Sequence, residues 1–289
     1  MKKCKTLAML TVALGVVFIT NSCSSDNAAT TADEAALTVT ANDESQASSF
    51  SDDVDNEVDN YVTTSDINGF SAVKSLAGAE VTTNGPVITV DKPDSTNFPK
   101  IFTIDYGTTG ITGKRGNVFK GIIKIVVSNK MTVPNSSRTI TFDNFSVNGN
   151  KVSGTKVVTY KGLKDVVHPY WTISVRDTIN RVDGTTVIWN SERTRERMDN
   201  NGTPLIYWDD NYSISGSSSG VNAKGVSFTA VIDANNPLLI GGGWPFFTKG
   251  TITISSDSKT VVIDFGNGNK DRIATATING VTKTFTMKN

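Results

Sequence analysis

The chain has 289 residues, with 28 Lys and Arg against 28 Asp and Glu, one His and two Cys. This length allows one or two domains with a sizeable core. The scarcity of His and Cys argues against a metal centre built on these two residue types, and the zero net charge argues against a nucleic-acid-binding protein.

The first 22 residues have the pattern of a secretory signal peptide. Lys2, Lys3 and Lys5 form a basic start, and the apolar stretch Leu7–Ile19 follows it. Thirteen residues are too few to cross a hydrocarbon layer of about 30 Å as a helix. We therefore exclude residues 1–22 from the folded domain.

Cys23 lies where the apolar stretch ends, and the surrounding sequence resembles the lipobox of bacterial lipoproteins. Ser22 is the small residue that such motifs place before the cysteine, whereas Thr20 departs from the usual leucine. The resemblance implies cleavage before Cys23 and a lipid on this residue, which would hold the protein at a membrane without spanning it. The alternative is an ordinary signal peptide followed by an incidental cysteine. Because Cys4 leaves with the signal, the mature chain has no internal disulfide.

The next segment is strongly acidic. Between Ser24 and Asp66 there are eleven acidic residues and no basic ones, whereas residues 67–289 contain 25 basic and 17 acidic residues. Residues 23–42 consist mainly of Ala, Thr, Ser, Asn and Asp, so we expect a disordered acidic tether there.

Residues 43–62 are expected to form a short helix. Phe50, Val54, Val58 and Tyr61 recur at helical spacing and form a narrow apolar stripe. The simplest interpretation is a helix that packs this stripe against the body, since the opposite charges of the two parts favour contact. A helix that docks on a partner and a disordered segment are the alternatives.

Residues 79–289 are expected to form an all-β domain. Apolar residues alternate with polar ones in many segments, such as 171–176 and 274–279, as is typical of antiparallel sheets with one buried face. Tight-turn pairs such as Asn148-Gly149 and Asn279-Gly280 separate these segments. We predict about fourteen strands in an antiparallel meander of hairpins that forms a sandwich or an open barrel.

Three segments resemble an uncharacterised flavobacterial-type (Bacteroidetes) family of envelope lipoproteins. They are residues 104–110, 139–155 and 264–268, and the resemblance covers most of residues 45–289. It implies a β-fold and an outer-membrane location on the periplasmic or cell-surface face, and it carries no activity. Relatives are expected to have a cysteine pair where this chain has Gly242 and Lys270.

Several residues are candidates for a ligand-binding site. Trp208, Trp244 and Tyr207 offer rings for sugar stacking, although packing is the alternative for each. Asp209 and Asp210 offer carboxylates, with a simple turn as the alternative. Arg193 and Arg195 share one face of a strand and suit an anionic glycan, with a solvated charged strand as the alternative.

No catalytic residue, cofactor or metal ligand is predicted. Gly216-Ser217-Ser218-Ser219-Gly220 matches a nucleophile motif, but strands flank it where the motif requires a helix. His168 is interpreted as a surface-loop residue. Ser95 and Thr178 lie in short sequences that resemble O-glycosylation sites of Bacteroidetes envelope proteins.

Taken together, the sequence favours a lipid-anchored cell-envelope protein. Its partners are expected to be a membrane, through the lipid on Cys23, and a glycan or another envelope protein, with no nucleic acid. Two other functions stay open: a hydrolase of surface carbohydrate, which would gather acidic residues in a cleft near His168 or Arg193, and a purely structural spacer or assembly subunit.

Overall fold

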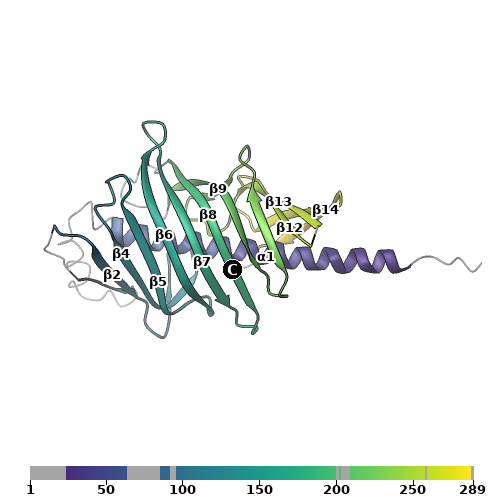
Figure 1. The fold of residues 1–289 in the computed structure, drawn as a ribbon, viewed down its shortest axis with the longest axis horizontal. Helices are drawn as coiled ribbons and strands as arrows, with labels where there is room; N and C mark the ends of the chain where they lie inside the picture. The colour runs from purple at the N-terminus through teal and green to yellow at the C-terminus, as the bar shows by residue number, and fades with distance from the viewer. Residues whose placement is uncertain are drawn as a thin grey trace, which may run out of the picture.

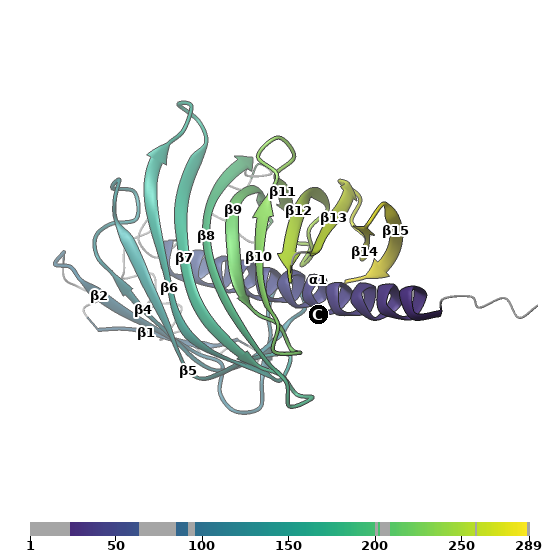
Figure 2. The same ribbon diagram turned by 45° about the vertical axis from the view of Figure 1, so that its right-hand side comes forward.

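In the computed structural model, the body is one continuous antiparallel β-sheet that curves around a long helix (Figures 1 and 2). The structure describes residues 24–63, 85–91, 96–199, 202, 209–257 and 259–287, with side chains from Leu37 onward. The signal peptide, Cys23, Ser95, Tyr207 and Trp208 lie outside the described residues.

Within the described residues, the sheet contains fifteen strands in nearly sequential order. Consecutive long strands pair with each other, and only β3 and β11 lie off the main path: β3 pairs with β4, and β11 pairs with β9 and β12. The strands are β1 (Val87–Val90), β2 (Lys100–Asp105), β3 (Ile111–Thr112), β4 (Val118–Val127), β5 (Ser137–Val147), β6 (Asn150–Leu163), β7 (Pro169–Asn180), β8 (Thr186–Asp199), β9 (Asn211–Val221), β10 (Ser227–Ile232), β11 (Leu238–Gly241), β12 (Lys249–Ser256), β13 (Lys259–Asn267), β14 (Ile273–Ile278) and β15 (Val281–Thr286).

Local sequence explains both the turns and the curvature of this sheet. Asn148 and Gly149 adopt φ values of 51° and 82°, the conformation that a tight hairpin between two strands requires. Near Gly121, where φ is 79°, the pairing of β4 with β5 shifts register. A Cβ atom at this glycine would lie 2.2 Å from the carbonyl oxygen of Asn144, so the local bend depends on the missing side chain.

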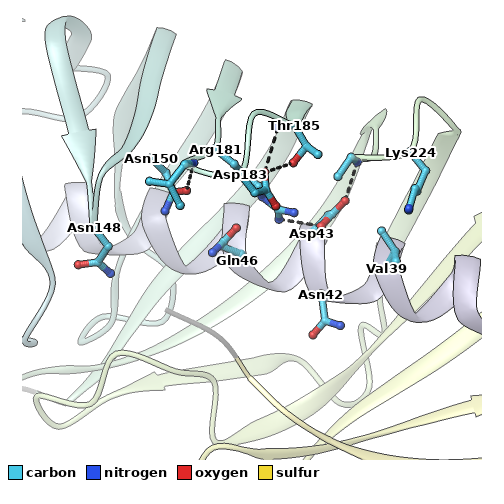
Figure 3. A pocket seen from close by; sticks show the side chains of 12 residues that line it. Val39, Asn42, Asp43, Gln46, Asn148, Asn150, Arg181, Asp183, Thr185 and Lys224 are labelled. Carbon is cyan, nitrogen blue, oxygen red and sulfur yellow. Dashed lines mark hydrogen bonds and ion pairs between the residues drawn. The ribbon is translucent and has the colours of Figure 1, made fainter.

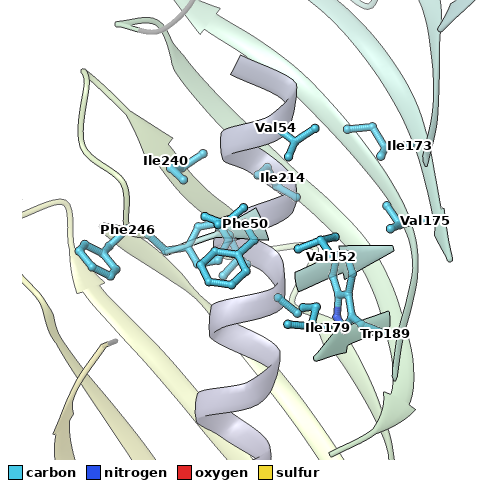
Figure 4. Close-up of a cluster of buried hydrophobic side chains, with 14 of the residues drawn as sticks. Phe50, Val54, Val152, Ile173, Val175, Ile179, Trp189, Ile214, Ile240 and Phe246 are labelled. Atoms are coloured by element: carbon cyan, nitrogen blue, oxygen red, sulfur yellow. The ribbon is translucent and has the colours of Figure 1, made fainter. Parts of the chain in front are cut away.

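The helix α1 (Ser24–Val58) continues as a π-helical turn, η1 (Asp59–Thr63). From Asp43 to Asp59 nearly every side chain is buried, because the sheet encloses the helix on several sides. Phe50 and Val54 pack against inward-facing residues of the sheet that include Ile173 and Ile214 (Figure 4). Ser, Thr, Asp and Asn are poor helix formers, so packing against the sheet must supply much of the stability of α1.

The predicted all-β meander is confirmed, as one sheet and not as two packed sheets. The apolar stripe of the predicted helix is also confirmed: Phe50, Val54 and Val58 are buried, and Tyr61 packs against the core. The helix is longer than predicted, because it begins at Ser24 and occupies the range where a disordered tether was expected. The main difference is burial, since the acidic residues between Asp43 and Asp59 lie inside the molecule and not in solvent. None of the described helices is long and apolar enough to cross a membrane.

Candidate functional site

The concave face of the sheet presents basic side chains to the acidic helix. Arg193 in β8 binds Glu44, with 2.7 Å between Nη2 and Oε1, and the indole nitrogen of Trp189 donates to the other oxygen of Glu44 over 2.7 Å. The guanidinium of Arg193 also lies 5.0 Å from the centre of the Trp189 ring. All three side chains are almost completely buried. The predicted glycan contact Arg193 is therefore part of the core.

A second group of buried pairs holds the C-terminal half of the helix. Lys156 in β6 lies 2.7 Å from a carboxylate oxygen of Asp55 and donates to Ser51 as well. Arg195 in β8 lies 3.1 Å from a carboxylate oxygen of Asp59, which Arg138 in β5 also binds. Arg195 faces the helix and is almost completely buried, so the alternative of a solvated charged strand does not hold for it.

Other buried acidic groups of the helix have raised pKa values, because burial disfavours their charged form. Burial raises the pKa of Glu57 to about 7, although the hydroxyl of Tyr106 donates to it over 2.9 Å. Burial also raises the pKa values of Asp52 and Asp53. Asp53 accepts a hydrogen bond of 2.5 Å from Asn117, which lowers its pKa in part. We interpret this interior as a structural network, since basic side chains of the strands face acidic side chains of the helix.

The described part of the chain contains a polar pocket of about 400 Å³ where the helix meets three turns of the sheet (Figure 3). We call it the mouth pocket. Its principal polar side chains are Asn42, Asp43 and Gln46 of α1, Arg181 and Asp183 of the β7–β8 turn, and Lys224 of the β9–β10 turn. Val39, Val182 and Ala223 add apolar surface.

Arg181 and Asp43 form the back of the mouth pocket. Nη2 of Arg181 lies 2.7 Å from a carboxylate oxygen of Asp43, and the other oxygen of Asp43 accepts a 2.7 Å hydrogen bond from the backbone of Ala223. The Nε atom of Arg181 is buried and makes no hydrogen bond to any described residue. Asn42, Gln46 and Lys224 are partly or fully exposed to solvent. The pocket thus combines a buried ion pair at its back with solvent-accessible polar side chains at its rim.

The two predicted carboxylates, Asp209 and Asp210, differ in burial. Asp210 is fully buried, with an oxygen 3.4 Å from Arg197 and 3.3 Å from the hydroxyl of Tyr212. Burial raises the pKa of Asp210 to about 7. Asp209 is half-buried beside it. The structure therefore places Asp210 beside Arg197.

Trp244 is half-buried and does not stand free on the surface. Its ring packs against Phe246 with 5.9 Å between centroids, and its indole nitrogen lies 3.3 Å from the carbonyl oxygen of Asp271. Nearby, the ammonium of Lys270 donates to the carbonyl oxygen of Gly242 over 2.7 Å. The two positions at which relatives are expected to carry a cysteine pair are thus in contact.

Thr178 lies within β7, paired with Ser153 on one side and Ile188 on the other, where its hydroxyl is half-buried. The Gly216–Gly220 stretch, which matches the letters of a nucleophile motif, lies within β9, so the strand-to-helix turn that the motif requires is absent from this described segment.

His168 lies in the β6–β7 loop, as predicted, but two carboxylates lie close to it. Its Nδ1 atom is 2.8 Å from Oδ2 of Asp165 and 3.8 Å from Oε1 of Glu196 in β8. Sequence reasoning missed this cluster because Glu196 is 28 residues away along the chain. It missed the mouth pocket for the same reason, since three turns and the helix each contribute to it.

Comparisons with protein-family models, with curated proteins and with solved structures found no match.

Proposed function

We propose that this is a lipid-anchored cell-envelope protein whose β-domain binds a glycan at the mouth pocket and has no catalytic role. The observation that carries the proposal is the lining of the pocket: amide, carboxylate, guanidinium and ammonium groups around a preformed hollow of about 400 Å³. This volume is within the usual range for small-ligand sites, about 300–1,000 Å³.

The chemistry of the lining suits a neutral ligand rich in hydroxyl groups. The side chains of Asn42 and Gln46 carry both donors and acceptors, as sugar hydroxyls do. The two acidic residues, Asp43 and Asp183, balance the two basic ones, Arg181 and Lys224, so the charge of the lining does not select a strongly charged ligand. The apolar surface from Val39, Val182 and Ala223 suits the C–H face of a sugar ring.

A glycan array probed with the purified mature protein tests this function. Asn42→Ala and Lys224→Ala should each weaken binding about three- to tenfold, the effect of losing a hydrogen bond worth about 0.5–1.5 kcal/mol. Lys124→Ala, which removes an exposed lysine on β4 away from the pocket, should leave binding unchanged. Binding by no glycan, or equal binding by all three variants, would contradict the proposed site.

The envelope location rests on Cys23 and on the signal peptide before it. Radiolabelled palmitate should be incorporated into the protein in its bacterial host and should be lost in Cys23→Ser. Incorporation that survives this substitution, or no incorporation into the unmodified protein, would contradict the lipid anchor while leaving the test of the pocket intact.

A further inference from the structure

The loop between β6 and β7 brings together three side chains of the types that bind transition-metal ions. Asp165 and His168 come from the loop, and Glu196 comes from β8, whose register places it opposite Tyr170 of β7. One nitrogen and two carboxylate oxygens from these residues all lie within 4.8 Å of one another. Their positions come from a hairpin and a neighbouring strand, so the sheet itself sets the spacing.

In both Asp165 and Glu196, one carboxylate oxygen accepts a hydrogen bond and the other lies near the imidazole of His168. Oδ1 of Asp165 accepts a 3.1 Å hydrogen bond from the backbone N–H of His168, while Oδ2 is the atom nearest Nδ1. Oε2 of Glu196 accepts a 2.6 Å hydrogen bond from the ammonium of Lys164, while Oε1 is the atom on the side of Nδ1. Such outer contacts orient the carboxylates of metal sites.

We propose that Asp165, His168 and Glu196 bind a divalent transition-metal ion, with Zn²⁺ as the best fit. Imidazole nitrogen and carboxylate oxygen are both ligands of Zn²⁺, at about 2.0–2.2 Å. Ligand atoms around such an ion lie closer together than 4.8 Å, so small side-chain rotations would close the site. Three protein ligands leave at least one position for water. The proposal is independent of the glycan function.

The charges around the cluster also favour a cation. The two carboxylates of the cluster outnumber the ammonium of Lys164, which pairs with Glu196. The side chain of Glu196 is only 11% exposed, so its oxygen is held in place, whereas His168 and Asp165 remain accessible from solvent. An ion can thus enter from the solvent side without opening the fold.

His168 is the only histidine of the chain, which gives the proposal an unambiguous test. NMR of the purified mature protein should show one set of imidazole resonances, and Zn²⁺ should shift them at one ion per chain while Ca²⁺ and Mg²⁺ should not. Calorimetry should give a dissociation constant in the micromolar range that weakens at lower pH, because protons compete with the metal for the imidazole. Unshifted imidazole resonances at millimolar Zn²⁺ would overturn the proposal without any substitution.

Variants then identify the ligands. His168→Gln, Asp165→Asn and Glu196→Gln should each weaken Zn²⁺ binding at least tenfold. Glu192→Gln is the matched control: this residue lies in the same outward row of β8 and pairs with Arg176, outside the cluster. Equal affinity in His168→Gln and the unmodified protein would place any bound zinc elsewhere and overturn the assignment. Far-UV circular dichroism should show that all four variants remain folded.

Discussion

Asp177 in β7 is a buried carboxyl group beside the helix. It is 7% exposed, and its Oδ1 atom makes no hydrogen bond to any described residue. Burial raises its pKa to about 7, with Lys156 lowering this pKa and Asp55 raising it. The group is therefore largely protonated in the folded protein at pH values where it is ionised in the unfolded chain.

The raised pKa predicts the sign of a pH effect on stability. Between about pH 4 and pH 7 the folded state holds a proton at Asp177 that the unfolded state has lost, so the free energy of unfolding falls as the pH rises, by up to about 1.4 kcal/mol per unit. Asp177→Asn removes this dependence. We expect the variant to gain stability relative to the unmodified protein from pH 5 to pH 8, as measured by urea unfolding.

Asp183 in the exposed β7–β8 turn provides a control of opposite sign. Hydrogen bonds from Thr185 lower the pKa of Asp183, so its ionised form stabilises the fold once the pH exceeds the ordinary value. Asp183→Asn should therefore lose stability relative to the unmodified protein as the pH rises to about 4, the ordinary carboxyl value, and the deficit should stay constant above it. Parallel pH profiles for the two variants would contradict this interpretation.

At the scale of elements, buried ion pairs join the helix to the sheet. Glu44→Gln would leave the guanidinium of Arg193 buried without its charged partner, and such a loss costs about 3–5 kcal/mol. Replacing both residues, as in Glu44→Leu with Arg193→Leu, should recover much of this loss, because an apolar pair needs no compensation for lost hydration. Urea unfolding of the single and double variants measures the coupling. A double variant as unstable as the sum of both single ones would contradict it.

Strands and turns were predictable where the local sequence alone determines the structure. Alternation along β7 and β8 follows from one buried face, and Asn148-Gly149 is a turn because few other residue pairs adopt positive φ at both positions. The candidate sites were not predictable in this way. Asn42 and Arg181 come together in the mouth pocket because the helix passes the β7–β8 turn. His168 and Glu196 come together because β7 pairs with β8.

At the scale of the whole molecule, α1 fills the space that the sheet encloses. Without the helix, inward-facing residues such as Trp189 and Ile173 would be open to water, and so would the basic side chains Lys156, Arg193 and Arg195. We therefore expect helix and sheet to unfold in one cooperative transition. Helical circular dichroism at about 222 nm and the fluorescence of the tryptophans, among them Trp189, should change at the same urea concentration.

A substitution in the core sharpens this prediction. Phe50→Ala should lower the free energy of unfolding by about 3–5 kcal/mol and shift both signals together, because the cavity lies between the helix and the sheet. Loss of the helical signal at urea concentrations where the tryptophan emission is still that of the folded protein would show that the sheet is stable alone, contrary to the expectation.

The sequence by itself determined the class of the fold, the sites of many turns, the presence of a helix between residues 43 and 62, and the basis for expecting a signal peptide and a lipid site at Cys23. These features depend on local patterns and on the period with which apolar residues recur. Only the tertiary structure decided that the acidic residues between Asp43 and Asp59 lie inside the molecule. From the sequence, a charged segment is expected to be exposed to solvent, because burying it requires a matching set of opposite charges. Here Lys156, Arg193 and Arg195 supply these charges, and they reach their partners only after distant strands have paired.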